Sequence, residues 1–348
     1  MKKSVCLILT LLWLIVGYIL VDATKTEAKQ PHYNLMLEAS RKAQLCYDRI
    51  YLYKMENGIE LNSKSDKLKT GLIGLDYSFI TTTLGNEEAK RTSINPNMAA
   101  MVVDMFHEIG LEKGDEVGIN CSGSFPALNM AVLCAVEVME LKPMIMSSYG
   151  ASTHGANDER FTYLDMEHLL YEEDYIAYKS DFFSVGGMLD QGLEMPTEIK
   201  QVINERIMGY GYPFFEETDL IENVNKRFDM YEEDKNIKCF INVGGNDVSF
   251  GDSYIIVHAK GGLLTKLSED DHSTGLVQLY LRKGIPVVHL LDIKELAYKY
   301  GMPVDPAIKP LVGEGKLYYE YRYSKWLVGF VLVGVSALFF VMKKKKVF

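Results

Sequence analysis

The stretch GDEVGINCSGSFPALNMAVLCAVE, residues 114–137, indicates the fold of this chain. Residues 115–121 have the apolar character of a buried strand, and 127–140 are apolar on nearly every side, as expected of a helix buried against a sheet. The SGSFP loop, residues 122–126, joins the two, and a further strand is expected over 142–150. This order predicts a βαβ unit.

Outward from this unit, helical and strand patterns alternate along the chain. Such alternation, with continuous apolar strands, is typical of an α/β fold in which helices sandwich a mostly parallel sheet. The segment 210–218 fits either a boundary between two lobes or a surface loop. Strands are expected at 77–85, 182–190, 237–245 and 285–291, and helices at 32–55, 95–110, 196–208, 219–233 and 293–300.

Uncharged apolar runs stand near both ends of the chain, at 5–21 and 326–342. Each is at the short end of what crosses a bilayer, and lysines stand between each run and the nearer end of the chain. We therefore expect a two-pass cell-membrane protein with both termini cytoplasmic. The predicted parts are an anchor (1–21), an extracytoplasmic α/β domain (22–325), a transmembrane helix (326–342) and a basic cytoplasmic tail (343–348). A cleaved signal peptide is the alternative for the first run, whose length favours an uncleaved anchor.

Charge and cysteine content narrow the function of the domain. The formal net charge of −10 includes six terminal lysines, so the segment between the apolar runs carries −16. Such a domain repels polyanions on average, and nothing indicates nucleic-acid binding. Cys121, Cys134 and Cys239 lie in apolar segments without CxxC spacing, which favours buried thiols over disulfides or a metal site.

The SGSFP loop has three possible roles, because ligands of parallel sheets collect at the carboxyl ends of strands. Ser122 or Ser124 could cap the following helix, or the helix N-terminus with Gly123 could bind an anion. Either serine could also be a nucleophile, as on the G-x-S-x-G turn of hydrolases. Asn120 and Ser124 replace the outer glycines of that motif, so the match is poor.

A second glycine-bearing loop, NVGGNDVSFG at 242–251, ends another predicted strand. Gly244 and Gly245 permit close backbone approach to a ligand, and Asn246 and Asp247 add short polar groups, although all four are also ordinary turn residues. We expect this loop and the SGSFP loop to share one edge of the sheet.

A long polar loop, 147–173, follows the βαβ unit. His154 is the best candidate for a general base, and Arg160 could hold a carboxylate. His154 and Asp158 could be two metal ligands, but no third ligand accompanies them, so we expect neither a metal nor another cofactor.

Five segments are more specific together than singly: SGSFPALN (122–129), SSYGAS (147–152), FTYLDME (161–167), SVGGMLDQG (184–192) and INVGGN (241–246). As a set between two apolar runs, they resemble the bacterial poly-γ-glutamate system protein family. Members occur alongside the poly-γ-glutamate ligase and its small membrane partner, and are taken to serve synthesis, export or surface retention of that polymer. The resemblance therefore implies three partners, namely the polymer, the membrane and the synthetase subunits, but it supplies no catalytic residues.

Three functions stay open at this point. The first is a membrane-anchored accessory protein that binds poly-γ-glutamate through the two glycine-bearing loops and Arg160. The second is a hydrolase or transferase of γ-glutamyl bonds, with Ser122 or Ser124 as nucleophile, His154 as base and backbone N–H groups as the oxyanion site. The third is a scaffold for the synthetase complex.

Overall fold

The structure is a computed structural model that describes residues 3–251, 260–268 and 271–344. Contacts divide the chain into a terminal unit, Met1–Tyr33 with Tyr318–Phe348, and a central unit, Asn34–Leu317. The end of the expected basic tail, residues 345–348, lies outside the described residues.

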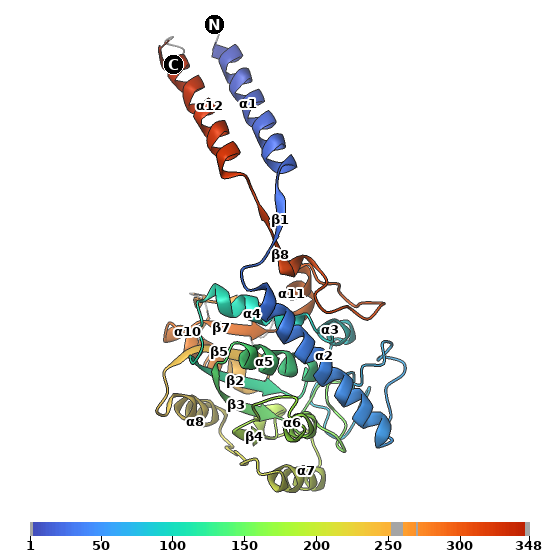
Figure 1. The fold of residues 1–348 in the computed structure, drawn as a ribbon. Coiled ribbons are helices and arrows are strands. Elements are labelled where there is room, and N and C mark those ends of the chain that lie inside the picture. The colour runs from blue at the N-terminus through green and yellow to red at the C-terminus, as the bar shows by residue number, and fades with distance from the viewer. Residues whose placement is uncertain (1–2, 252–259, 269–270, 345–348) are drawn as a thin grey trace. The chain divides into compact units, whose positions relative to one another are not determined.

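A six-stranded sheet forms the core of the central unit, in the order β4-β3-β2-β5-β7-β6 (Figure 1). Its strands pair in parallel except β6, which is antiparallel to β7. The predicted α/β fold with a mostly parallel sheet is confirmed. The strands are β2 (Glu116–Ser122), β3 (Lys142–Ser148), β4 (Phe182–Ser184), β5 (Ile237–Val243), β6 (Gly262–Leu264) and β7 (Val287–Leu290).

Helices surround this sheet, and most lie where the apolar periodicity predicts them (Figure 1). They are α2 (Tyr33–Glu56), α3 (Glu87–Ser93), α4 (Met98–Glu108), α5 (Pro126–Val138), α6 (Tyr163–Glu172), α7 (Thr197–Gly209), α8 (Leu220–Glu232), α9 (Asp247–Phe250), α10 (Leu276–Arg282) and α11 (Ile293–Lys299), with short 3₁₀ turns η1 (Met188–Asp190) and η3 (Lys316–Tyr318).

Aromatic side chains fill the face of the sheet that carries Phe240 of β5. The ring of Phe240 stacks on Tyr280 of α10 with 4.4 Å between centroids, and meets Tyr231 of α8 edge-on at 5.4 Å. Gly118 of β2 makes room for them, because a Cβ there would lie 3.1 Å from both Phe240 and Tyr231. The buried Tyr231 hydroxyl donates to the Ile119 carbonyl oxygen at 2.7 Å, so burial of this tyrosine leaves its own hydroxyl paired.

Helix α5 is buried all round because α2 packs on it as a further layer. The Tyr47 hydroxyl of α2 donates to the Ala127 carbonyl oxygen at 2.8 Å, and the Cys46 and Cys134 sulfurs lie 3.9 Å apart. Helix α4 also packs against α5, so the apolar circumference of 127–140 is explained by three neighbours, the sheet, α2 and α4. The four described cysteines, those at 46, 121, 134 and 239, are buried free thiols.

The structure corrects two expected strands and decides between the two alternatives for the segment 210–218. Residues 77–85 form a loop rather than a strand, and their ladder pairing is limited to an isolated bridge from Thr81 to Ala151. The strand expected over 182–190 ends at Ser184, because Gly186 and Gly187 have φ of 76° and 72°, which a strand cannot hold. The segment 210–218 lies inside one compact unit and is not a boundary between lobes.

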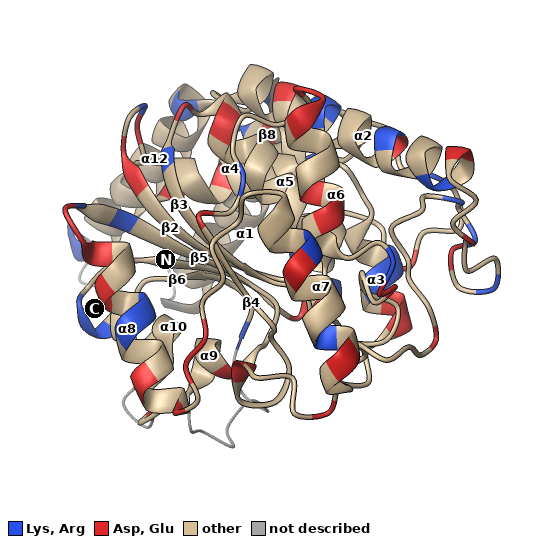
Figure 2. Ribbon diagram, turned by 90° about the horizontal axis from the view of Figure 1, so that it is seen from below, with Lys and Arg blue, Asp and Glu red and all other residues tan. Residues whose placement is uncertain are grey.

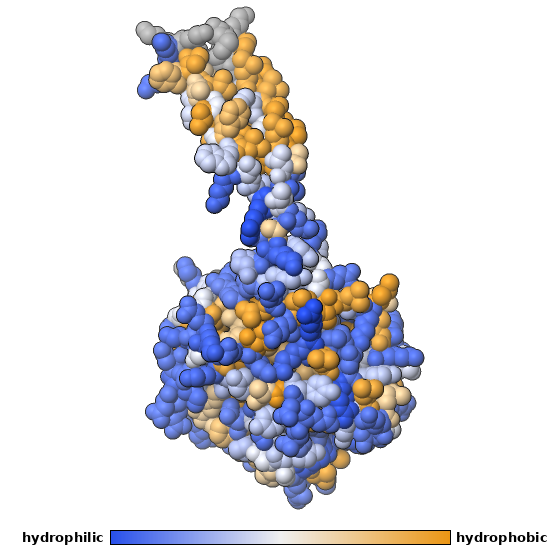
Figure 3. All heavy atoms as spheres, in the orientation of Figure 1, coloured by the Kyte–Doolittle hydropathy of each residue, from blue (hydrophilic) through white to orange (hydrophobic). Residues whose placement is uncertain are grey.

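The terminal unit pairs the two ends of the chain. Strand β1 (Thr26–Lys29) is antiparallel to β8 (Tyr319–Arg322), and helices α1 (Lys3–Ala23) and α12 (Lys325–Lys344) adjoin them (Figure 1). Hydrophobic side chains cover both helices (Figure 3). Within the described residues, α12 alone is long and apolar enough to cross a membrane, and the apolar stretch of α1, Leu7–Ala23, is shorter. A membrane span at the N-terminal helix α1 therefore stays a prediction.

Helices α1 and α12 pack closely through small residues. The Trp13 indole N–H donates to the Val331 carbonyl oxygen at 2.9 Å, and the Trp13 ring lies 5.5 Å from Phe330. A Cβ at Gly17 would lie 2.6 Å from Val331, and one at Gly334 would overlap the Trp13 ring. Small residues of this kind let apolar helices approach each other closely. In lipid this close packing stabilises helix pairs, because the hydrophobic effect does not drive helices together there.

We expect Gly334→Leu to separate α1 from α12, because the added side chain would occupy the place of the Trp13 ring. In a Trp326→Phe background Trp13 is the only tryptophan, and its quenching by brominated detergent should rise. Gly329→Leu is the matched control, since a Cβ there meets no atom within 4 Å. Equal quenching in the two variants would contradict the observed packing.

Candidate functional site

The sheet changes its direction of growth between β2 and β5. From β2 the chain adds β3 and then β4 on one side, and β5 and then β7 on the other (Figure 1). In open α/β sheets, ligands bind outside the carboxyl ends of the strands at such a switch point. The loops that leave β2 and β5 there are the SGSFP loop and the loop over 242–251.

The backbone of the SGSFP loop is fixed against the loop that follows β3. The Gly123 N–H donates to the Ser148 carbonyl oxygen at 2.9 Å, and the Gly123 carbonyl oxygen accepts from the Ala156 N–H at 2.8 Å. A Cβ at Gly123 would lie 2.6 Å from the Tyr149 carbonyl oxygen, which explains the glycine. The Gly123 N–H is thus already paired and does not face a ligand.

Neither serine of this loop caps α5. The N-cap residue is Phe125, without a side-chain cap, and Pro126 takes the first helical position. Ser122 Oγ instead accepts from the Ser124 N–H at 3.2 Å, and the Ser122 carbonyl oxygen accepts from Asn129 Nδ2 at 2.9 Å. The prediction of a serine cap is wrong because the proline starts the helix later than a serine cap requires.

The second loop adjoins the first. A Cβ at Gly244, where φ is 88°, would lie 3.2 Å from Ser122 Cβ, so only glycine fits without strain. Asn246 caps α9 by accepting from the Ser249 N–H at 3.2 Å, and Asp247 Oδ2 accepts from the Leu189 N–H at 2.7 Å. Gly245 is exposed. Both glycine-bearing loops therefore lie together at the carboxyl edge, while Asp247 also links η1 to α9.

A buried row of polar side chains, missed in the sequence, crosses the sheet below these loops. Asn120 on β2, Asn242 on β5 and His289 on β7 are partners in register and at most 1% exposed. Asn120 Nδ2 donates to Asn242 Oδ1 at 2.7 Å, and Asn242 Nδ2 lies 3.1 Å from His289 Nδ1 and donates to the Gly244 carbonyl oxygen at 2.7 Å. The signal was a single polar residue in each apolar strand, INC at 119–121 and INV at 241–243.

His289 makes folding sensitive to acid. Burial lowers the pKa of His289 from 6.5 to about 4, so the folded chain keeps the ring neutral where the unfolded chain binds a proton. The free energy of unfolding should fall by roughly 3 kcal/mol as the pH drops from 6.5, the ordinary pKa of histidine, to about 4, the pKa of His289 in the folded chain.

We expect His289→Asn to make the free energy of unfolding less dependent on pH in this range, as measured by denaturant unfolding at a series of pH values. An unchanged slope would show that other groups set the acid sensitivity.

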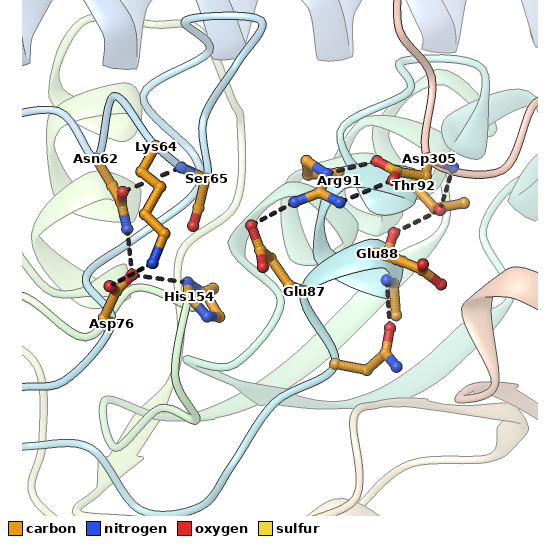
Figure 4. Close-up of polar contacts among 12 residues, drawn as sticks. Asn62, Lys64, Ser65, Asp76, Glu87, Glu88, Arg91, Thr92, His154 and Asp305 are labelled. Atoms are coloured by element: carbon orange, nitrogen blue, oxygen red, sulfur yellow. Dashed lines mark hydrogen bonds and ion pairs between the residues drawn. The ribbon is translucent and has the colours of Figure 1, made fainter.

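The structure pairs the His154 ring with Asp76 and not with either serine (Figure 4). His154, at φ 61°, has Nδ1 3.6 Å from Asp76 Oδ1, and in the described chain no hydrogen bond joins it to Ser122 or Ser124. Arg160 is bound in bidentate fashion to Asp158, at 2.9 and 2.7 Å. In the described chain, neither of these two side chains therefore bonds to the glycine-bearing loops. Among the described residues, no group of three or more His, Cys, Asp or Glu could hold a metal ion.

A buried ion pair holds the loop after β4. Arg227 of α8 contacts Asp190 at 2.5 Å, both side chains are 2% exposed, and Ser184 Oγ donates to Asp190 Oδ1 at 2.9 Å. Leu189 and Asp190 have φ of 54° and 63°, values that non-glycine residues rarely adopt. The ion pair thus fixes a strained turn at the carboxyl edge.

Arg227→Met should lower the free energy of unfolding by roughly 3–5 kcal/mol, because it leaves Asp190 buried without its cation. Lys64→Met is the control: Lys64 is 84% exposed and lies 3.8 Å from Asp76, so its loss should cost less than about 1 kcal/mol. Denaturant unfolding of the full chain in detergent measures both. Similar values would contradict a stabilising role for the buried pair.

Lys90, to which the sequence analysis gave no role, also reaches this edge. It lies on α3 in the polar-looking segment NEEAKRTS, is 2% exposed, and its Nζ donates to the carbonyl oxygen of Ser124. It also donates to Ser152 Oγ at 2.8 Å and lies 3.7 Å from the centroid of the Phe125 ring. Burial lowers the pKa of Lys90 to about 7. No periodicity in such a short helix marks its inward face.

The strand order and the adjoining loops define an open, doubly wound α/β protein with a candidate ligand site at the switch point between β2 and β5. No family model, no curated protein and no solved structure matches the chain.

Proposed function

We propose that this chain is a membrane-attached accessory protein of poly-γ-glutamate production that holds a short section of the γ-linked chain at the carboxyl edge of its sheet. One observation carries the proposal: the SGSFP loop and the 242–251 loop adjoin at the switch point, where sheets of this class bind ligands. The five segments that resemble the poly-γ-glutamate system family include the SGSFP loop and residues 242–246 of the second loop. The apolar helix α12 supports attachment to a membrane.

The accessible groups at this edge suit a confined contact. Gly245 is exposed, and Ser124 and Asn246 are partly exposed, so a hydroxyl, an amide and open backbone are available to a carboxylate or peptide group. Acidic and basic residues are interspersed along the ribbon around the sheet, without a continuous basic stretch in the view of Figure 2. With −16 on the segment between the apolar runs, the domain repels a polyanion at a distance. Binding must therefore come from local contacts.

We expect Gly245→Ala to weaken binding of a γ-linked glutamate oligomer about tenfold, because the methyl group obstructs approach to the backbone. The fold should be unaffected, since an added Cβ comes no closer than 3.4 Å to its neighbours. Fluorescence anisotropy with the full chain in lipid nanodiscs measures this. Gly209→Ala is the control, because a Cβ at Gly209 meets no atom within 4 Å.

An α-linked glutamate oligomer of equal length tests whether the linkage is recognised. Saturable binding of the γ-linked oligomer that Gly245→Ala weakens and Gly209→Ala leaves intact would support the proposal. Absence of saturable binding by the wild-type chain would overturn it.

A further inference from the structure

Helix α3 is fixed so that Lys90 faces the protein interior. Asn86 caps the helix, its Oδ1 accepting from the Ala89 N–H at 2.9 Å. Arg91 forms two bonds to Asp305, at 2.5 and 2.7 Å, and also pairs with Glu87 (Figure 4). Of the charged neighbours of Lys90 on its own helix, Arg91 is thus engaged with Glu87 and Asp305, and Glu88 pairs with Lys294 at 2.9 Å.

The Lys90 ammonium meets neutral groups. Its partners are the Ser124 carbonyl oxygen, the Ser152 hydroxyl at 2.8 Å and the Phe125 ring. A buried amine without an anionic partner is readily held neutral, and a pKa of about 7 for Lys90 leaves about half of it unprotonated at neutral pH. A neutral amine beside a serine hydroxyl is able to accept the hydroxyl proton.

A second serine lies beside the first. Ser124 Oγ accepts from the Ser152 N–H at 3.0 Å. In the described chain its own hydroxyl hydrogen makes no hydrogen bond, and the residue is partly exposed. It is therefore free to donate to a group that reaches Ser152.

We propose that Ser152 is a nucleophile and Lys90 its general base, in an acyl-transfer site that takes a carboxylic amide or ester. The assignment of a γ-glutamyl amide as the substrate rests on the proposed function. The site itself rests on the Lys90–Ser152 contact and the adjacent Ser124 hydroxyl.

In the first step Ser152 Oγ bonds to the substrate carbonyl carbon while its proton moves to neutral Lys90 Nζ. The carbonyl oxygen becomes an oxyanion that accepts a hydrogen bond from Ser124. The carbon–nitrogen bond then breaks, and the Lys90 ammonium returns the proton to the departing amine. Water, or an acceptor amine, next attacks the ester on Ser152, Lys90 takes its proton, and that proton returns to Ser152 Oγ as the acid or new amide leaves.

Access to Ser152 is controlled by the loop over 77–85. Ser152 is 6% exposed, and hydrogen bonds hold the loop over it: Thr82 N–H to the Ala151 carbonyl oxygen at 2.9 Å, Ala151 N–H to the Ile80 carbonyl oxygen at 3.3 Å, Thr153 N–H to the Thr83 carbonyl oxygen at 2.9 Å, Gly85 N–H to Thr153 Oγ1 at 2.8 Å and Asn157 Nδ2 to Thr81 Oγ1 at 3.0 Å. Leu84, next to these contacts, is 91% exposed. These bonds must break for the loop to move aside, as lids do in many enzymes.

The test is labelling of the full chain in nanodiscs with a fluorophosphonate, which reacts with activated serines, followed by mass spectrometry of the modified peptide. We expect Ser152 to be labelled at a rate that rises with pH around a midpoint near 7, in line with the pKa of Lys90. Ser152→Ala should abolish labelling, and Lys90→Met should slow it at least 100-fold. Lys54→Met is the matched control, because Lys54 is also buried but its Nζ lies over the Phe161 ring.

Thermal unfolding of each variant shows whether it is folded. If Lys90→Met fails to fold, the wild-type chain still decides: an unlabelled Ser152 would mean that Lys90 only ties loops together, and would overturn the proposal. Labelling of Ser152 that Lys90→Met and Lys54→Met slow equally would overturn the role of Lys90 as base.

Incubation with γ-linked glutamate oligomers then tests the substrate. Shortening that requires Ser152 would support the γ-glutamyl assignment, and intact oligomer beside a labelled Ser152 would overturn that assignment alone. The oligomer-binding experiment with Gly245→Ala is independent of these results, so failure of the binding function and failure of the acyl-transfer site are distinguishable.

Discussion

The amide of Asn242 connects the strands on which the candidate site depends. It accepts from Asn120 on β2, donates toward His289 on β7, and donates to the carbonyl oxygen of Gly244 where β5 ends. In a low-dielectric core such bonds are strong when every partner is present and costly when one is lost. They therefore fix the register of three neighbouring strands and, with it, the positions of the two glycine-bearing loops.

Around this row, each loop at the carboxyl edge is attached to a different neighbour. The SGSFP loop is bonded to the chain that follows β3, and the turn after β4 is bonded to α8 through Asp190 and Arg227 and to α9 through Asp247. Most polar groups at this edge thus already form hydrogen bonds within the protein. Few groups are left accessible there, chiefly at Ser124, Gly245 and Asn246.

The parts of the fold that local sequence determines were predictable. The buried strands and α5 have continuous apolar sequences, and the two glycine-bearing loops follow strands whose carboxyl ends necessarily meet in a parallel sheet. The strand expected at 77–85 was wrong, because β-branched residues there pack as a loop against residue 151 and not in a ladder. The family resemblance of the five segments, and the function it implies, stay predictions.

The missed site residues depend on partners remote in sequence. Lys90 and Ser152 are 62 positions apart, and Asn120 and Asn242 are 122 apart, so no local sequence motif contains either pair. His154 was the expected base because it stands in the polar loop that follows the βαβ unit, but its ring pairs with Asp76. The sequence does not show which way a loop side chain points once loops fold back on one another.

The pairing of β1 with β8 sets an order of events during synthesis. Thr26 and Arg322 are partners separated by 296 positions, so β1 leaves the ribosome long before β8 exists. At the usual rate of translation this delay is roughly 15–60 s, during which the edge of β1 has no native partner. The strand is only TEAK, short and carrying Glu27 and Lys29, and such charge discourages pairing with other chains. The last strand to be made thus closes the terminal unit, and an incomplete chain cannot form it.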